Sequence, residues 1–354
     1  MHGQAAWLVD GLGYRAVLAR VGMLQNYGDS MSNIDWLSQL LKMVTVTGQL
    51  EVRCSYGAPW RVSWGKSAAH VIPYHVVLKG RALVEDLASG TTRELVGGDI
   101  VLLPRGEAHV LHDGSGEVPG AASLRQSAAG WKVSENLGTG ERLDMLCGRF
   151  FIAPPHHRLI RDYLPVDLVV RTLDSQLADN DLSVSSHLAG LLGIMRMEST
   201  DDKPGAGAIL NALTSALFAL VLRAASEAAQ APAGLLTLAG NPRLAPAISA
   251  MFTHPAHPWS LPELAELCSM SRATFMRHFH DKLGRSANEL LLDIRMSLAA
   301  NELQKTTMTT EAVADLVGYR SVAAFRRAFT DKMGITPGQW RRQALRSSEF
   351  YVSS

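Results

Sequence analysis

The feature of this sequence that most constrains its fold is a duplicated segment near the C-terminus. Residues 275–284 (FMRHFHDKLG) recur fifty residues later as residues 325–334 (FRRAFTDKMG). A short apolar segment precedes each copy, LAEL at residues 264–267 and VADL at residues 313–316. Two copies are too few for a solenoid, in which at least three repeats are needed to bury a continuous core. The repeat therefore predicts a duplicated helical module.

Each copy has the layout of two short helices joined by a tight turn. In the first copy, Ser260 and Glu263 have the spacing of a capping box, and Ser271 is placed to cap the second helix. Gly284 follows that helix as a stop signal. The second copy repeats this plan, with Ser321 as the cap. The sequence thus predicts two helix-turn-helix modules.

A single helix is predicted to connect the two modules. Residues 287–303 have a helical period, with Leu290, Leu291, Ile294 and Leu298 facing inward. At 1.5 Å per residue this helix is roughly 25 Å long, enough to hold two recognition helices about one turn of DNA apart. A short helix with small residues at its front edge and arginines behind them fits a major groove about 12 Å wide. The outward-facing residues are Arg272, Ala273, Met276, Arg277 and His280 in the first module, and Val322, Ala323, Arg326, Arg327 and Thr330 in the second.

The charge distribution permits a nucleic-acid partner for this region. The chain has a net charge of +1, yet residues 258–346 hold thirteen Lys/Arg against nine Asp/Glu. The rest of the chain is therefore slightly acidic. The asymmetry is mild, because solvated helical faces often have a similar excess of charge, so it allows DNA binding without requiring it.

Residues 241–345 resemble the AraC family of transcription regulators. The most specific stretch is GYRS-x3-FRR-x-F-x4-GITP-x2-WR at residues 318–341, although the family often has Tyr at the position of Trp340. The resemblance implies sequence-specific binding to double-stranded promoter DNA and regulation of transcription as an activator or a repressor, with RNA polymerase as a candidate further partner. By position it assigns contacts with the duplex to Arg272, Ala273, Met276, Arg277, Ser321, Val322, Ala323, Arg326 and Arg327.

The N-terminal half has the sequence pattern of short β-strands separated by turns. From residue 31 to about 150, short alternating stretches are separated by glycine-containing turn signals at intervals of about eight to ten residues. Residues 98–109 (GDIVLLPRGEAH) fit the second cupin motif, G-x5-P-x-G-x2-H, which ends on His109. The first cupin motif needs His-x-His and a downstream Glu, and only His75 stands in its place. We expect a cupin-like antiparallel β-barrel.

The histidines of this barrel leave two interpretations open. His75 and His109, with His112 as a further candidate, make two or three possible ligands, whereas metal enzymes use three or four. The favoured interpretation is that His75 and His109 line an effector pocket or form a satisfied core pair, with no metal, no cofactor and no catalysis. The alternative is a cupin-type metal enzyme fused to a helical tail, which stoichiometric bound metal would identify.

The cysteines indicate a reducing compartment. Cys54, Cys147 and Cys268 have no Cys-x-x-Cys spacing, which argues against a secreted disulfide scaffold. Free cysteine is among the most buried residue types, so a packing role is expected for Cys268 and is the competing interpretation for the other two.

Residues 31–165 resemble the cupin-type sensor of one AraC subgroup, which includes reactive-chlorine sensors. The supporting segments are APW (58–60), YHVVLKG (74–80), the cupin motif and LCGRF (146–150) leading to LP (164–165). The resemblance implies a redox role for Cys54 and Cys147: a thiolate is oxidised to a sulfenic acid, which condenses with the second thiol. Arg53 and Arg149 are expected to favour the thiolates. An organic effector at His75 and His109 is an equal alternative, and no ligand sensing at all remains open.

The predicted architecture is an α+β multidomain chain. It comprises an extension outside the fold at residues 1–30, a cupin-like sensor at 31–153, a helical linker at 154–240 and an all-α double helix-turn-helix at 241–346. The middle helices either pack within the chain or form a homodimer. No uninterrupted apolar run reaches the roughly 18 to 20 residues of a membrane helix. We therefore expect a cytoplasmic dimer without a membrane partner.

Overall fold

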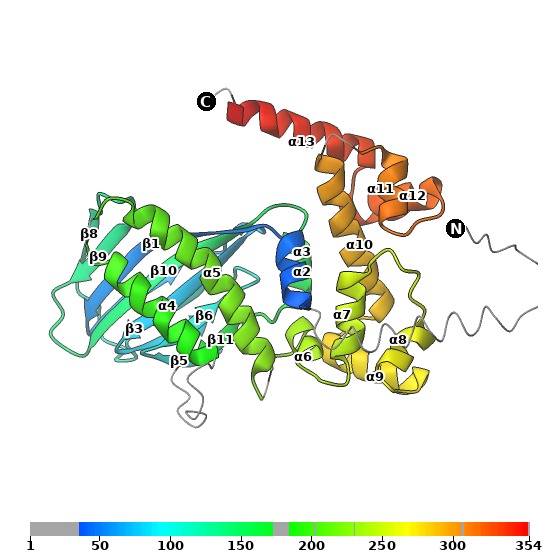
Figure 1. Cartoon of the computed structure of the whole chain (residues 1–354). Coiled ribbons are helices and arrows are strands. Elements are labelled where there is room, and N and C mark those ends of the chain that lie inside the picture. Colours follow the sequence, from blue (N-terminus) through cyan, green and yellow to red (C-terminus); the bar gives the residue numbers. More distant parts are fainter. Residues whose placement is uncertain (1–34, 173–183, 202, 230, 306–307, 353–354) are drawn as a thin grey trace, which may run out of the picture.

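The computed structural model describes residues 35–172, 184–201, 203–229, 231–305 and 308–352, and their side chains as far as residue 344 (Figure 1). The predicted extension at residues 1–30 lies outside the described residues. The described chain begins with α2 (Trp36–Met43), whose N-cap Asp35 accepts a hydrogen bond from the Ser38 N–H at 2.9 Å.

Two sheets form the N-terminal domain, as the cupin-like prediction requires. Among the described residues, one sheet has the strand order β11-β6-β3-β10-β1-β9-β8 and the other the order β2-β7-β4-β5. The pairs are antiparallel except β1–β9, which is parallel. The exception arises because β1 is inserted between the consecutive strands β9 and β10. The strands are β1 (Val46–Gly57), β2 (Arg61–Trp64), β3 (Val71–Lys79), β4 (Arg81–Asp86), β5 (Thr92–Val96), β6 (Asp99–Leu102), β7 (His109–His112), β8 (Ala122–Gln126), β9 (Lys132–Asn136), β10 (Arg142–Ile152) and β11 (Leu168–Arg171).

The segment predicted to be a purely helical linker also contains a strand, β11, which pairs with β6. The prediction is wrong in this respect. Helix α5 crosses β1 on the seven-stranded sheet and α4 packs beside α5, while α3 and α6 contribute buried side chains to the same hydrophobic cluster (Figure 1). The backbone N–H of Gly48 on β1 donates to Ser215 Oγ at 3.0 Å, and Phe218 packs on Phe150 with ring centroids 5.0 Å apart. These helices are therefore part of the sensor core. They are α3 (His157–Tyr163), α4 (Val184–Glu198), α5 (Ala206–Glu227) and α6 (Leu235–Ala239).

One helix corrects the expectation about membrane spans. Within the described part of the chain, α5 is long and apolar enough to cross a membrane by length and composition. The run of apolar residues is broken by Asn211 and Thr214, so a search for an uninterrupted run misses it. Its buried face, which includes Leu217 and Val221, packs on the sheet, and this packing accounts for the composition.

The C-terminal region forms the predicted double helix-turn-helix. Ser260 and Glu263 make both bonds of the capping box, and Ser271 and Ser321 cap the second helix of each module. Gly284 ends the first of these helices in the left-handed conformation (φ 73°), which favours glycine. The helices are α7 (Ala245–Thr253), α8 (Leu261–Leu267), α9 (Arg272–Leu283), α10 (Ala287–Gln304), α11 (Thr310–Leu316), α12 (Val322–Met333) and α13 (Pro337–Val352).

The hydrophobic core is divided unequally between the two modules. One cluster of buried side chains runs from the sheet through α2, α5, α6 and α7 into α8 and α9, where it includes Phe275 and Phe279. The second module has its own cluster around Phe325 and Phe329. The first module is thus fused to the sensor by apolar packing, while the connecting helix α10 links the second module to it.

Candidate functional site

The outward faces of the two recognition helices, α9 and α12, are accessible. The phenylalanines of each helix point inward and are fully buried, as the spacing of four residues predicts. Met276 is 45% exposed, which is unusual for a large apolar side chain and suits contact with a thymine methyl group. The exposed candidate residues are Arg272, Ala273, Met276, Arg277, Ser321, Ala323, Arg326 and Arg327, and Val322 is half-buried.

The arginines on these faces differ in their partners. Arg326 forms an exposed ion pair with Glu311, with an N–O distance of 3.2 Å. Arg272, Arg277 and Arg327 make no hydrogen bond or ion pair with any described residue. Three guanidinium groups are therefore available for phosphate or guanine without breaking a contact, whereas Arg326 has to leave Glu311 first.

The two cysteines singled out in the sensor lie side by side. In the β1–β10 ladder Cys147 is opposite Val52, and Cys54 is opposite Met145, so the cysteines are diagonal neighbours on one face. That face is turned into a buried cluster in the domain, where both thiols are free. The two thiols are close enough for each to affect the pKa of the other. The structure thus brings together two residues that are 93 positions apart in the sequence.

The environments of the two thiols are unequal. The hydrogen bond from Cys147 lowers the pKa of Cys54 against the opposing effect of burial, and a bond with Tyr56 lowers it further. Burial raises the pKa of Cys147 well above its ordinary value, and the bond with Cys54 adds to this. Since the thiolate is the nucleophile, Cys54 is the sulfur better suited to attack an oxidant.

The expectation that Arg53 and Arg149 favour the thiolates is wrong. Successive residues of a strand point to opposite faces, so Arg53 lies outside the core that holds Cys54. It binds Asp144, and the Asp144 charge raises the pKa of Cys54. Arg149 likewise pairs with Glu51 at 3.1 Å. The neighbouring thiol and Tyr56, not the arginines, stabilise the Cys54 thiolate.

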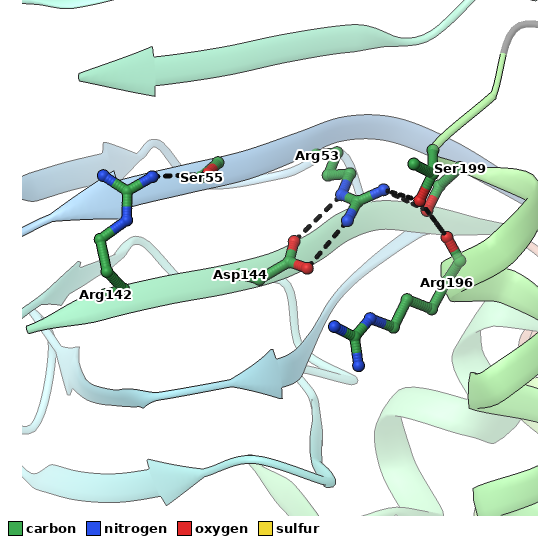
Figure 2. Close-up of polar contacts among 7 residues, drawn as sticks. Arg53, Ser55, Arg142, Asp144, Arg196 and Ser199 are labelled. Atoms are coloured by element: carbon green, nitrogen blue, oxygen red, sulfur yellow. Dashed lines mark hydrogen bonds and ion pairs between the residues drawn. The ribbon is translucent and has the colours of Figure 1, made fainter. Parts of the chain in front are cut away.

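On the outer face, the Arg53 contacts connect the two cysteine strands to α4. Arg53 binds Asp144 through two parallel hydrogen bonds of 3.0 and 2.8 Å (Figure 2). The same guanidinium donates to Thr200 Oγ1 at 2.7 Å and to Ser199 Oγ at 3.3 Å. Both hydroxyls in turn donate to the Arg196 carbonyl at the end of α4. Strands β1 and β10 are therefore tied to the end of α4 directly behind the thiol pair.

The two cupin histidines form a closed pair. His75 Nε2 and His109 Nε2 are 2.8 Å apart, and His109 Nδ1 donates to the Glu107 carbonyl at 2.9 Å. His109 Nε2 must then be the acceptor, so His75 carries its proton on Nε2 and its buried Nδ1 has no partner among the described residues. Trp64 stacks on the His109 ring with centroids 5.4 Å apart. Burial lowers the pKa of both histidines, which keeps them neutral.

This histidine pair does not fit a metal centre. Within the described residues, no group of three or more His, Cys, Asp or Glu is placed to hold a metal ion. The candidate third ligand His112 faces away, because it is three residues from His109 in a strand, and its Nδ1 accepts a bond from the Gly114 N–H. The cavity beside His109 has a volume of about 20 Å³, room for one water molecule.

Two contributors to these sites were missed in the sequence. Tyr56 lies two residues after Cys54 in the same strand, so strand alternation was a usable signal that it shares the face of the thiol. Trp64 is opposite His109 in the β2–β7 ladder, and no local sequence pattern predicts that pairing. The contact between the cysteines depends on the β1–β10 register in the same way.

Comparisons with known proteins match both regions. A cupin family model matches residues 35–227, and a helix-turn-helix domain model matches residues 264–343. The RCS-specific HTH-type transcriptional activator RclR of Escherichia coli is 27% identical over 314 residues, which cover 88% of this chain and 98% of that protein. The HTH-type transcriptional regulator MtrA of Neisseria gonorrhoeae is 28% identical over 313 residues, covering 88% of this chain and 99% of that protein.

Proposed function

The chain belongs to the AraC-type transcription regulators that carry an N-terminal cupin domain, and from this premise we propose that the Cys54–Cys147 thiol pair controls its binding to DNA. Its helix-turn-helix region is of the kind that binds double-stranded DNA. The observation that carries the proposal is the contact between the two buried thiols, one of which has a lowered pKa. The exposed α9 and α12 faces supply the DNA contacts.

The proposed chemistry is a two-electron oxidation of the thiol pair. The Cys54 thiolate takes the oxygen of hypochlorous acid, forming a sulfenic acid and releasing chloride. The Cys147 sulfur then attacks the Cys54 sulfur, so that an S–S bond forms, the S–O bond breaks and water leaves with the thiol proton. Cys54 is the attacking thiol and Cys147 the resolving thiol, in agreement with the opposite shifts of their pKa values.

A disulfide at this position would shift the two strands that carry it. Diagonal neighbours in antiparallel strands are typically about 7–8 Å apart, whereas a disulfide needs Cα atoms within roughly 4.4–6.8 Å. Bond formation therefore shifts β1 and β10 along each other, next to the register irregularity between Leu50 and Val52. The Arg53–Asp144 pair on the outer face passes this shift to α4 (Figure 2).

The oxidant is favoured over the organic effector considered for the histidine pair. Pockets for organic ligands measure about 300–1,000 Å³, and the cavity beside His109 has about 20 Å³. We also propose a cytoplasmic regulator without catalytic activity, since its relatives are named as regulators and no described residue joins His75 and His109 as a third ligand. A purified protein with stoichiometric bound metal would contradict this part.

The experiment is binding of the full-length protein to DNA upstream of its own gene, measured reduced and after treatment with hypochlorous acid. We expect specific binding over scrambled DNA with a steep salt dependence, and a shift in Kd of about tenfold on oxidation. Cys54→Ser should abolish the shift, and Cys268→Ser should preserve it. Specific binding with the same Kd before and after oxidation would contradict the thiol proposal. The assignment as a DNA-binding regulator would still hold.

We further propose that the chain acts as a homodimer through α4 and α5. Ile194 and Met197 on α4 are 43% and 64% exposed, and Ile209 on α5 is 42% exposed. Exposed large apolar side chains on two helices that pack together are typical of a protein interface. Light scattering should give twice the chain mass for the wild type and a lower mass for Met197→Asp, whereas a monomeric wild type would refute the proposal.

A further inference from the structure

The second helix-turn-helix module is attached to the rest of the molecule more loosely than the first. The first module shares the hydrophobic cluster of the sensor, whereas the second packs in a cluster of its own. Helix α10 continues from one module to the other (Figure 1). The position of the second recognition helix therefore depends on α10 and on whatever contacts it from the side.

Helix α3, which belongs to the sensor, supplies side contacts through a buried carboxylate on α10. The Tyr163 hydroxyl donates to Asp293 Oδ2 at 2.6 Å, and the Asp293 side chain is only 7% exposed. Lys332, in the last turn of α12, forms an ion pair with the other oxygen of Asp293. One carboxylate thus joins the sensor, the connecting helix and the second recognition helix.

Two arginines extend these contacts to both modules. Arg158 on α3 donates to the Lys332 carbonyl at 2.6 Å, which satisfies a free carbonyl at the end of α12. Arg285, directly after α9, pairs with Asp162 on α3 at 3.1 Å and lies over the Tyr163 ring, 5.3 Å from its centre. Helix α3 therefore touches the end of the first recognition helix and the end of the second.

These contacts are polar rather than close-packed. A cavity of about 170 Å³ lies in the seam between α3, α10 and α12, and its lining includes Arg158, Asp162, Asp293 and Lys332. Because apolar packing is interrupted there, hydrogen bonds and ion pairs hold the second module against α3. Contacts of this kind depend on direction, so they fix a geometry more strictly than an apolar surface does.

We propose that Arg158, Asp162 and Tyr163 form a brace, acting through Asp293 and Lys332. The brace fixes the spacing that this regulator accepts between two DNA half-sites, which are the segments contacted by α9 and by α12 of one chain. The inference rests on the proposed DNA contacts of α9 and α12. One base pair inserted between half-sites moves them by about 3.4 Å and rotates them by about a tenth of a turn. With the brace in place, the recognition helices cannot follow this displacement, and the protein binds the altered operator weakly. Without the brace, the second recognition helix can move and the affinity is largely kept.

The brace is also connected to the sensor strands. Helix α3 begins five residues after β10, the strand that carries Cys147. His156, the residue before α3, donates from Nε2 to Asn301 Oδ1 on α10 at 2.6 Å, and Asn301 Nδ2 donates to the Met43 carbonyl of α2 at 2.8 Å. A shift of β10 would therefore reach the spacing of the recognition helices through the brace.

The test uses the full-length protein and DNA that the wild type selects from a random library. Kd is measured for the selected operator and for the same operator with one base pair inserted between its half-sites. We expect the insertion to weaken the wild type by at least about tenfold and the double variant Arg158→Ala/Tyr163→Phe by no more than about threefold. Arg161→Ala on the same helix, which makes no bond to the helix-turn-helix region among the described residues, should behave as the wild type.

The outcomes separate this inference from the function on which it rests. If selection yields no preferred DNA, the proposed DNA contacts fail and the brace fails with them. If the wild type selects an operator and the double variant rejects the insertion as sharply, only the brace is overturned. Equal weakening on both operators would mark a merely structural role and also overturns it. Tyr163→Phe alone, which keeps the ring under Arg285, gives the answer if the double variant does not fold.

Discussion

At the residue scale, the histidine pair shows how burial decides the chemistry of a titratable group. His75 is 1% exposed, its pKa is lowered well below the ordinary value by burial, and the nearby His109 lowers it further. The two rings share one hydrogen bond, which needs one of the Nε2 atoms to be deprotonated. The hydrogen bond excludes a pair in which both rings are protonated, and burial disfavours a pair in which one ring is protonated.

This pair predicts a loss of stability on acidification. The unfolded chain protonates His75 near pH 6.5 and the folded chain does not, so unfolding takes up protons and stability falls as pH drops below that value. Between pH 7.5 and 5.5 we expect the free energy of unfolding of the wild type to fall by about 1 kcal/mol more than that of His75→Gln. Urea unfolding followed by tryptophan fluorescence measures this difference, and equal pH slopes for the two proteins would contradict it.

A second residue-scale prediction concerns the arginines of α12. Arg327→Ala should weaken DNA binding by roughly 1–3 kcal/mol, because its guanidinium makes no bond with any described residue and is available to the duplex. Arg326→Ala should cost less, since Arg326 gives up its ion pair with Glu311 in order to bind. Titrations on matched and mutated DNA distinguish the roles of Arg327: a uniform loss with a shallower salt slope marks a phosphate contact, and lost discrimination at one base pair marks direct readout. An unchanged Kd for Arg327→Ala would show that Arg327 does not contact the DNA.

At the element scale, the parts that the sequence predicts well are those with local signals. The caps Ser260, Ser271 and Ser321 and the stop Gly284 are read from a few neighbouring residues, and the structure confirms them. Pairings between distant strands have no such signal. The contact of Cys54 with Cys147 and the pairing of β11 with β6 are set by sheet register, which only the assembled fold defines. The side on which Arg53 lies was predictable from strand alternation, and the expectation about the thiolate overlooked it.

The docking of α5 on the sheet leads to a test of whether the middle helices belong to the sensor. A Cβ atom at Gly48 would lie 2.4 Å from Thr214 Cγ2, so Gly48→Ala forces α5 away from β1. We expect a loss of about 1–3 kcal/mol in the free energy of unfolding. Gly65→Ala is the matched control, because its Cβ would have no neighbour within 4 Å. If the two variants have equal stability in urea, α5 does not pack on the sheet as described.

At the scale of the whole molecule, successive short contacts connect the strands of the thiol pair to α4 on one side and to α3 on the other. The thiols lie on the inner face of β1 and β10, and Arg53 and Asp144 lie on the outer face of the same strands. Beyond β10, the chain continues directly into α3 and its contacts with both modules. A two-state change at the sheet therefore has two physical routes outward, one through α4 and one through α3.

Arg53→Ala tests the route through α4. The change leaves both thiols in place and removes the bonds from β1 to Asp144, Ser199 and Thr200 (Figure 2). We expect the disulfide to form as in the wild type, which mass spectrometry of the oxidised protein measures, while the shift in Kd for DNA shrinks by at least about threefold. Arg142→Ala is the control, because Arg142 lies on the same pair of strands and Ser55, at 3.3 Å, is its one side-chain partner among the described residues. A full response of Arg53→Ala to the oxidant would exclude this route and leave α3 as the path by which the sensor acts on the recognition helices.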